Sequence, residues 1–139
     1  MRDTDQAVFT AFVDDELREA YDLAELAQDS DGDWQFSTES GLVWVRVLPD
    51  PDLHVYIFCR VAEGVVAESW PEVNRLNAIM TAGALVLTDD STIIAMMRLH
   101  RSMTNRESLR VIIDAMAAYM RELGPMFEIV HGGGEPLPS

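Results

Sequence analysis

Three aspartates at alternate positions are the residues of this chain whose spacing most resembles a metal site. Asp29, Asp31 and Asp33 match the first acidic positions of a calcium-binding loop. Such a loop also needs Gly at its sixth position and an acid at its twelfth, where this chain has Trp34 and Ser40. The register therefore predicts no dedicated calcium site, although a calcium-binding or small-ligand-binding regulatory module that uses this acidic run stays open as an alternative function.

The other residues that commonly carry catalysis lack the partners that catalysis requires. His54, His100 and His131 do not stand at metal-ligand spacing, and no serine lies in a nucleophile-elbow motif. Cys59, the only cysteine, falls on the aliphatic side of a predicted strand, where burial makes a thiol inert. We therefore expect a non-enzymatic protein with no catalytic residue, no metal ligand and no cofactor.

A different kind of chemistry follows from the alternation of side chains in three predicted strands. Because successive side chains of a strand point to opposite faces of a sheet, residues 42–48, 53–61 and 92–100 each divide into two sets. One set is aliphatic and suits packing beneath the first and third helices. The other set has aromatic or methionine side chains together with one Arg in each strand.

This mixed aromatic, methionine and arginine face is the strongest functional signal in the sequence. Its residue types combine apolar area with an oriented polar end and are enriched in protein–protein interfaces. We predict that it contacts a second polypeptide. The predicted partner-binding residues are Trp44, Arg46, Tyr56, Phe58, Arg60, Met96 and Arg98. Two alternatives stay open, in which the second helix of the same chain or a second copy of the chain covers this face.

The strands follow from the hydrophobic periodicity of the sequence. Five segments alternate with period two, and the turn-forming run Asp89-Asp90-Ser91 joins the last two of them. The strands are predicted over residues 34–38, 42–48, 53–61, 84–88 and 92–100. We expect the second and third strands to form an antiparallel pair.

Capping signals place three helices around these strands. We expect the first helix over residues 5–28, started by Asp3. Ser69-Trp70-Pro71-Glu72 opens a second helix that runs to about Ala82 and is closed by Gly83. Thr104-Asn105-Arg106-Glu107 opens a third helix, which Gly124-Pro125 stops. The order helix–three strands–helix–two strands–helix predicts an α+β fold with a largely antiparallel sheet and helices packed against it.

Composition and charge exclude several classes of function. A chain of 139 residues with 48% hydrophobic content fits one domain over residues 1–139, whose ends at 1–4 and 132–139 we expect to be mobile. The formal net charge of −14 repels nucleic acids and anionic lipid surfaces. The longest uncharged stretch in the middle of the chain is too short to span a bilayer. With one cysteine and no disulfide framework, we expect a cytoplasmic protein without a nucleic-acid partner or membrane insertion.

The motifs that carry a family resemblance lie in the second half of the chain. Arg75-Leu76-Asn77-Ala78, then the apolar run 83–87, then the hairpin 89–95 resemble the YbjN-like and type III secretion chaperone-like (Tir chaperone-like) peptide-binding families. The turn differs from the family pattern, because Asp-Asp-Ser replaces the more usual Asp-Gly. The resemblance extends over residues 5–134. It implies a small acidic α+β protein, often a homodimer, that holds extended segments of a client polypeptide without catalysis.

Overall fold

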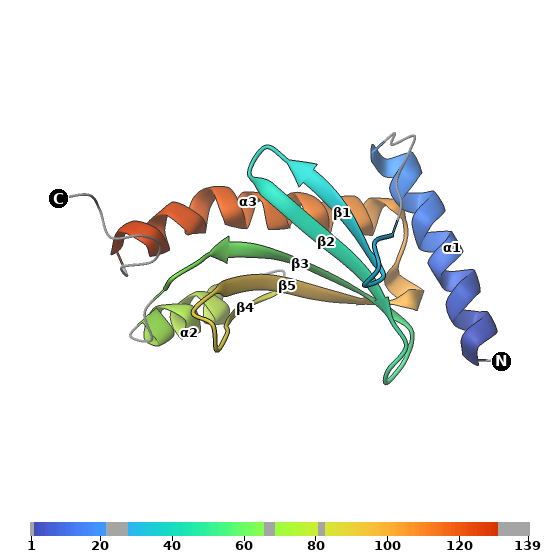
Figure 1. Ribbon diagram of the computed structural model, residues 1–139, viewed down its shortest axis with the longest axis horizontal. Helices are drawn as coiled ribbons and strands as arrows, with labels where there is room; N and C mark the ends of the chain where they lie inside the picture. Colours follow the sequence, from blue (N-terminus) through green and yellow to red (C-terminus); the bar gives the residue numbers. More distant parts are fainter. Residues whose placement is uncertain (1, 22–27, 66–68, 81–82, 131–139) are drawn as a thin grey trace.

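A computed structural model of the chain describes residues 2–21, 28–65, 69–80 and 83–130 (Figure 1). The predicted order of elements and the α+β class are confirmed. The elements are α1 (Arg2–Tyr21), β1 (Asp33–Thr38), β2 (Gly41–Leu48), β3 (His54–Ala62), α2 (Trp70–Ile79), β4 (Ala84–Leu87), β5 (Ile93–His100), the short 3-10 turn η2 (Arg101–Met103) and α3 (Arg106–Val130). Each strand begins and ends within one residue of its prediction.

The five strands form one antiparallel sheet in the order β1-β2-β3-β5-β4. The expected pair of β2 and β3 is confirmed, with Trp44 opposite Phe58 and Val45 opposite Ile57. The chain leaves β3 through α2 before β4 and β5 return, so that β5 pairs with β3 and β4 forms the outer strand. The register keeps the two predicted sets of side chains on opposite faces across the central strands.

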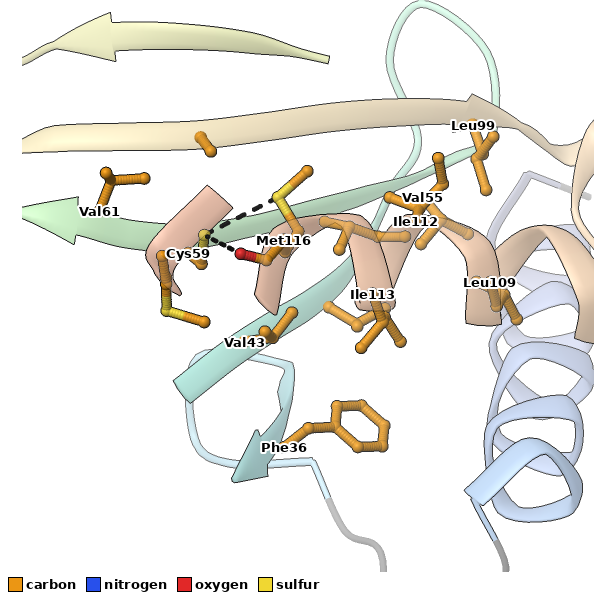
Figure 2. Packing of buried hydrophobic residues seen from close by; sticks show 14 of the residues in the cluster. Phe36, Val43, Val55, Cys59, Val61, Leu99, Leu109, Ile112, Ile113 and Met116 are labelled. Atoms are coloured by element: carbon orange, nitrogen blue, oxygen red, sulfur yellow. Dashed lines mark hydrogen bonds between the residues drawn. The ribbon is translucent and has the colours of Figure 1, made fainter. Parts of the chain in front are cut away.

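The aliphatic face of the sheet is sealed by α3, which lies along it (Figure 1). Figure 2 shows Ile112 of α3 beside Val55 of the sheet and Met116 of α3 beside Cys59. Val43, Cys59 and Met116 have no solvent-exposed surface, and Ile113 has almost none. The apolar side of α3 thus packs on the aliphatic side of the strands, and these two surfaces together form the core.

The first helix was expected beneath the sheet as well, but it lies mainly against α3. Figure 1 shows α1 crossing near the N-terminal end of α3, away from the middle of the sheet. Phe9, Val13 and Leu17 of α1 are buried, and Glu16 pairs with Arg106 of α3 at 3.1 Å. α3 lies along the aliphatic face, and the buried side chains of α1 extend the core beside it.

The predicted ends of α1 and α2 are partly wrong. The first helix already begins at Arg2, so Asp3 lies within it and is not its N-cap. It does not extend to Gln28, which instead forms an isolated bridge with Trp34; residues 22–27 lie outside the described part. Ser69 precedes α2 as expected, but its hydroxyl makes no capping hydrogen bond, and the helix ends at Ile79, before Ala82 and Gly83.

The third helix differs from its prediction at both ends. Its cap is one residue further along, because the Asn105 side chain accepts a hydrogen bond from the Ser108 N–H and the Ser108 hydroxyl accepts one from the Asn105 N–H, each at 2.9 Å. The helix also continues through Pro125 to Val130. Pro125 removes one backbone hydrogen bond, but continuing the helix places the side chain of Phe127 in the core with no exposed surface.

The second helix lies beside the outer strand β4, at the opposite end of the molecule from α1 (Figure 1). The Asn77 side-chain amide donates to the Leu85 carbonyl at 2.9 Å and accepts from the Leu85 N–H at 2.6 Å. These two bonds occupy backbone groups at the edge of the sheet, where an unpaired strand would otherwise invite association. Within the described residues, no helix combines the length and apolar character needed to cross a bilayer.

Candidate functional site

The second face of the sheet carries the residues that the sequence predicted to bind a partner. We call this surface the aromatic–Arg face and define it by Trp44, Arg46, Tyr56, Phe58, Arg60, Met96 and Arg98. They lie on β2, β3 and β5, the three central strands, and the register brings all seven together. None of the described helices packs across this surface, because α3 lies on the opposite face and α2 contacts mainly β4.

Aromatic contacts link β2 and β3 across this face. The rings of Trp44 and Phe58 stack with their centroids 5.6 Å apart, and those of Tyr56 and Phe58 meet at 4.8 Å. The Tyr56 hydroxyl lies 3.6 Å from the Met96 sulfur on β5. Same-face neighbours on adjacent strands are near enough to pack in this way. The face is therefore a continuous apolar platform across the three strands.

Each of the three arginines lies over a ring of this platform. The guanidinium carbons of Arg46, Arg60 and Arg98 lie 5.9, 5.6 and 4.8 Å from the centroids of Phe58, Trp44 and Tyr56, respectively. Such cation–π contacts hold a guanidinium in place while its N–H donors stay available at its edge. The cations therefore have defined positions on the face.

Two of the three arginines also have carboxylate partners. Arg46 binds Asp33 through two parallel hydrogen bonds, from Nε to Oδ1 and from Nη2 to Oδ2 at 2.9 Å. This bidentate pair raises the pKa of Arg46 above its ordinary value. Arg60 pairs with Glu63 at 2.8 Å, and both of these side chains are exposed. The sequence analysis did not assign Asp33 or Glu63 to this face.

The aromatic side chains of the face are half-buried, which distinguishes them from both core and ordinary surface. Trp44, Tyr56, Phe58 and Met96 have intermediate exposure. Burial raises the pKa of the Tyr56 hydroxyl, against the lowering effect of the nearby Arg98 and Arg46. The ring stays neutral and can act as a hydrogen-bond donor. A face of this kind can bury further apolar area against a partner and offer directed polar contacts.

The carboxylates of the acidic run interact with other groups of the protein itself. One carboxylate oxygen from each of Asp29, Asp31 and Asp33 lies within 4.8 Å of the others. However, Asp33 is bound by Arg46, and Asp29 Oδ1 accepts the backbone N–H groups of Asp31 and Asp33 at 2.9 and 3.0 Å. The bond from the Asp33 N–H is the largest cause of the lowered pKa of Asp29. These carboxylates shape a turn and neutralise Arg46, so the geometry does not favour the cation-binding alternative.

The thiol and the described histidines lie in structural positions. Burial raises the pKa of Cys59 to about 12, and its sulfur lies 3.6 Å from the Met116 carbonyl oxygen (Figure 2). The His54 ring is buried, with Nδ1 2.8 Å from the Asp52 carbonyl oxygen. Nδ1 of His100 lies 2.8 Å from the Ser102 hydroxyl, and His131 lies outside the described residues.

A groove beside α1 was not anticipated from the sequence. A groove of about 1000 Å³ lies between α1 and the edge formed by β1 and β2, lined by Thr10, Asp14, Trp34, Arg46 and Pro49 among others. The indole N–H of Trp34 donates to Asp14 at 2.9 Å in its wall. Its existence depends on where α1 lies in three dimensions. Local periodicity could not reveal it.

One family model matches residues 7–139, nearly the whole chain, and its description is T3SS (YopN, CesT) and YbjN peptide-binding chaperone 1. The chain belongs to this family. The family is one of peptide-binding chaperones. The resemblance drawn from the sequence is thereby confirmed. No curated protein sequence matches the chain.

Three solved structures of protein complexes share this fold. The chaperone SycH of Yersinia pestis, solved with a stable fragment of YscM2, has a TM-score of 0.65 and 12% identity, covering 83% of this chain and 98% of its own. The HopA1–SchA chaperone–effector complex gives 0.71 and 10%, with coverages of 88% and 97%. The ExsC–ExsE complex gives 0.70 and 8%, with coverages of 88% and 95%. At these identities the likeness shows that the fold is shared.

Proposed function

We propose that this member of the peptide-binding chaperone family is a non-enzymatic chaperone or adaptor that holds segments of a client polypeptide. It acts in the cytoplasm as a homodimer and contacts the client through the aromatic–Arg face. The observation that carries this proposal is the half-buried platform of Trp44, Tyr56 and Phe58, over which no described helix packs. Family membership supports a peptide as the ligand.

The physical argument concerns what this face gains from a partner. Its rings already contact each other, so little side-chain entropy is lost when a client covers them. Aromatic and Arg side chains dominate the free energy of many interfaces, where they act as buried anchors surrounded by weaker contacts. The arginines supply donors that fix the orientation of the client. The same features suit segments of different sequence, because the centre of the platform is apolar.

The homodimer has a separate candidate surface. Trp70 and Ile79 on α2 are 49% and 65% exposed, and Val86 on the neighbouring strand β4 is 39% exposed. Exposed large apolar side chains favour association with a second copy that can cover them. This surface lies on the outer strand and its helix, so a second copy bound there leaves the centre of the aromatic–Arg face free. Sedimentation of the wild type and of Ile79→Glu tests the dimer, and a monomeric wild type would contradict it.

The client-binding proposal is tested by changing Trp44 and Phe58 to Ser and measuring client capture together with thermal stability. We expect capture to fall at least about 30-fold, the loss that corresponds to removing one anchor of about 2 kcal/mol. The variant is expected to remain folded and dimeric, because both side chains are half-exposed. Captured polypeptides are identified by mass spectrometry and then measured as purified clients.

The matched control is Phe12→Ser, which removes an exposed aromatic ring from α1, away from both proposed surfaces. It should capture the client as the wild type does. If the double variant loses stability and its dimer dissociates, the aromatic–Arg face is structural and the proposed client site is wrong. Capture by a folded double variant at wild-type strength would contradict the proposal equally.

A further inference from the structure

The three arginines of the aromatic–Arg face differ in how their charge is neutralised. Arg46 is bound by Asp33, and Arg60 pairs with Glu63. Arg98 lies over the Tyr56 ring, yet among the described residues no carboxylate forms an ion pair with it. This distinguishes Arg98 from the other two arginines of the face, in a chain with 24 acidic and 10 basic residues. Arg98 is thus an exposed cation with room for an anionic partner.

Arg98 also has a fixed position next to an apolar surface. Its Cα lies opposite Tyr56 in the β3–β5 register, and the neighbouring same-face pair is Phe58 with Met96. The guanidinium lies 4.8 Å from the Tyr56 centroid. A stacked guanidinium keeps its planar set of N–H donors at its edge, the geometry that binds a carboxylate through two hydrogen bonds. Cationic and apolar recognition elements therefore lie side by side in the middle of the face.

The rest of the molecule makes this position selective. At a net charge of −14, most of the surface repels anions, and this repulsion is screened beyond about 8 Å at physiological salt. A carboxylate on a client segment therefore binds more favourably at Arg98 than elsewhere on the described surface of the face. A neutral amide at the same place forms weaker bonds, and an ammonium group is repelled by the guanidinium.

We propose that the aromatic–Arg face recognises client segments in which an Asp or Glu side chain stands beside bulky apolar side chains. The carboxylate binds the Arg98 guanidinium, and the apolar side chains lie on Phe58 and Met96. This inference rests on the proposed function and specifies the client chemistry at the same site.

The test uses three fluorescent twelve-residue peptides that alternate Leu or Phe with Ser or Thr and differ only in a central Glu, Gln or Lys. Binding to the full chain is measured by fluorescence anisotropy at physiological salt. We expect the Glu peptide to bind on the order of tenfold more tightly than the Gln peptide, with the Lys peptide weakest. Arg98→Gln should abolish the preference for Glu, and Arg98→Glu should transfer it to the Lys peptide.

The control is Arg121→Gln, which changes the net charge by the same amount as Arg98→Gln but at an exposed position of α3. It should keep the tenfold preference for the Glu peptide over the Gln peptide. Circular dichroism checks that every variant is folded. Equal binding of the Glu and Gln peptides to the wild type would overturn the acidic preference and leave the proposed function standing. Failure of all three peptides to bind would overturn both.

Discussion

The two faces of the central sheet are formed by the same strands, but one is buried and the other is partly exposed. Ile57 and Cys59 of β3 have no exposed surface beneath α3, whereas their neighbours Tyr56 and Phe58 are half-exposed on the other side. Both faces contain large apolar side chains, so composition alone does not decide which one is sealed. The decision comes from α3, whose apolar stripe packs on one face, while no described helix packs across the other.

The two faces are also stabilised by different interactions. The sealed face contributes to stability through the burial of aliphatic groups, about 25 cal/mol for each Å² removed from water. The aromatic–Arg face is held by ring stacking, cation–π contacts and the Arg46–Asp33 pair. Exposed contacts of this type contribute about 0.5–1 kcal/mol each. Mutations on the two faces should therefore affect different properties.

The largest effect is expected from adjacent residues of β3. Ile57→Ala should lower the free energy of unfolding by about 2–5 kcal/mol, because it leaves a cavity beneath α3. Phe58→Ala should cost roughly 1–2 kcal/mol, since the half-exposed ring gives up less burial. Denaturant unfolding of both variants measures the difference. Similar losses at the two positions would remove the distinction between the faces.

An intermediate effect is expected from the ion pair that joins the aromatic–Arg face to β1. Arg46→Gln leaves the nearly buried Asp33 carboxylate without its cation and should lower the free energy of unfolding by roughly 1–3 kcal/mol. This is less than for a fully buried pair, because Arg46 is partly exposed and water screens its charge. Asp33→Asn in the same chain should recover part of this loss. A double-mutant cycle measures the coupling, and additive effects would mean that the pair contributes nothing to stability.

The smallest effect concerns Cys59 on the sealed face. Its pKa is raised to about 12 by burial, whereas the thiol of the unfolded chain ionises near 8.5. The unfolded state therefore loses this proton first as the pH rises, and folding should weaken by about 1 kcal/mol by pH 9. Iodoacetamide should not label the native thiol at pH 8 but should label it in urea. Rapid labelling of the native protein would show that the face is not sealed.

Much of the fold could be predicted from local patterns. Period-two alternation fixed the membership of both faces, as Val45 beside Trp44 illustrates, because the pleat of a strand allows no other outcome. The order of helices and strands followed from the same periodicity. Alternation assigned the seven residues of the aromatic–Arg face to one set, and local rules predicted the pairing of β2 with β3. The pairing of β5 with β3, which brings Met96 and Arg98 beside the aromatic rings, is non-local and was not predicted.

The errors lie where tertiary contacts override local signals. Gly124-Pro125 is a strong stop signal, yet α3 continues because Phe127 is buried beyond it. Asp33 was considered only as part of the acidic run Asp29–Asp33, but pairing of β1 with β2 places it opposite Arg46. The groove beside α1 depends on how that helix crosses α3, which no local pattern specifies.

The most direct test of the account is site-specific photo-crosslinking of a client to each face. A photoreactive amino acid replaces Met96 in the middle of the aromatic–Arg face or the exposed Val111 on α3. We predict that a client polypeptide is crosslinked from position 96 and not from position 111. Adducts formed from position 111 alone would contradict the assignment of the open sheet face to client binding.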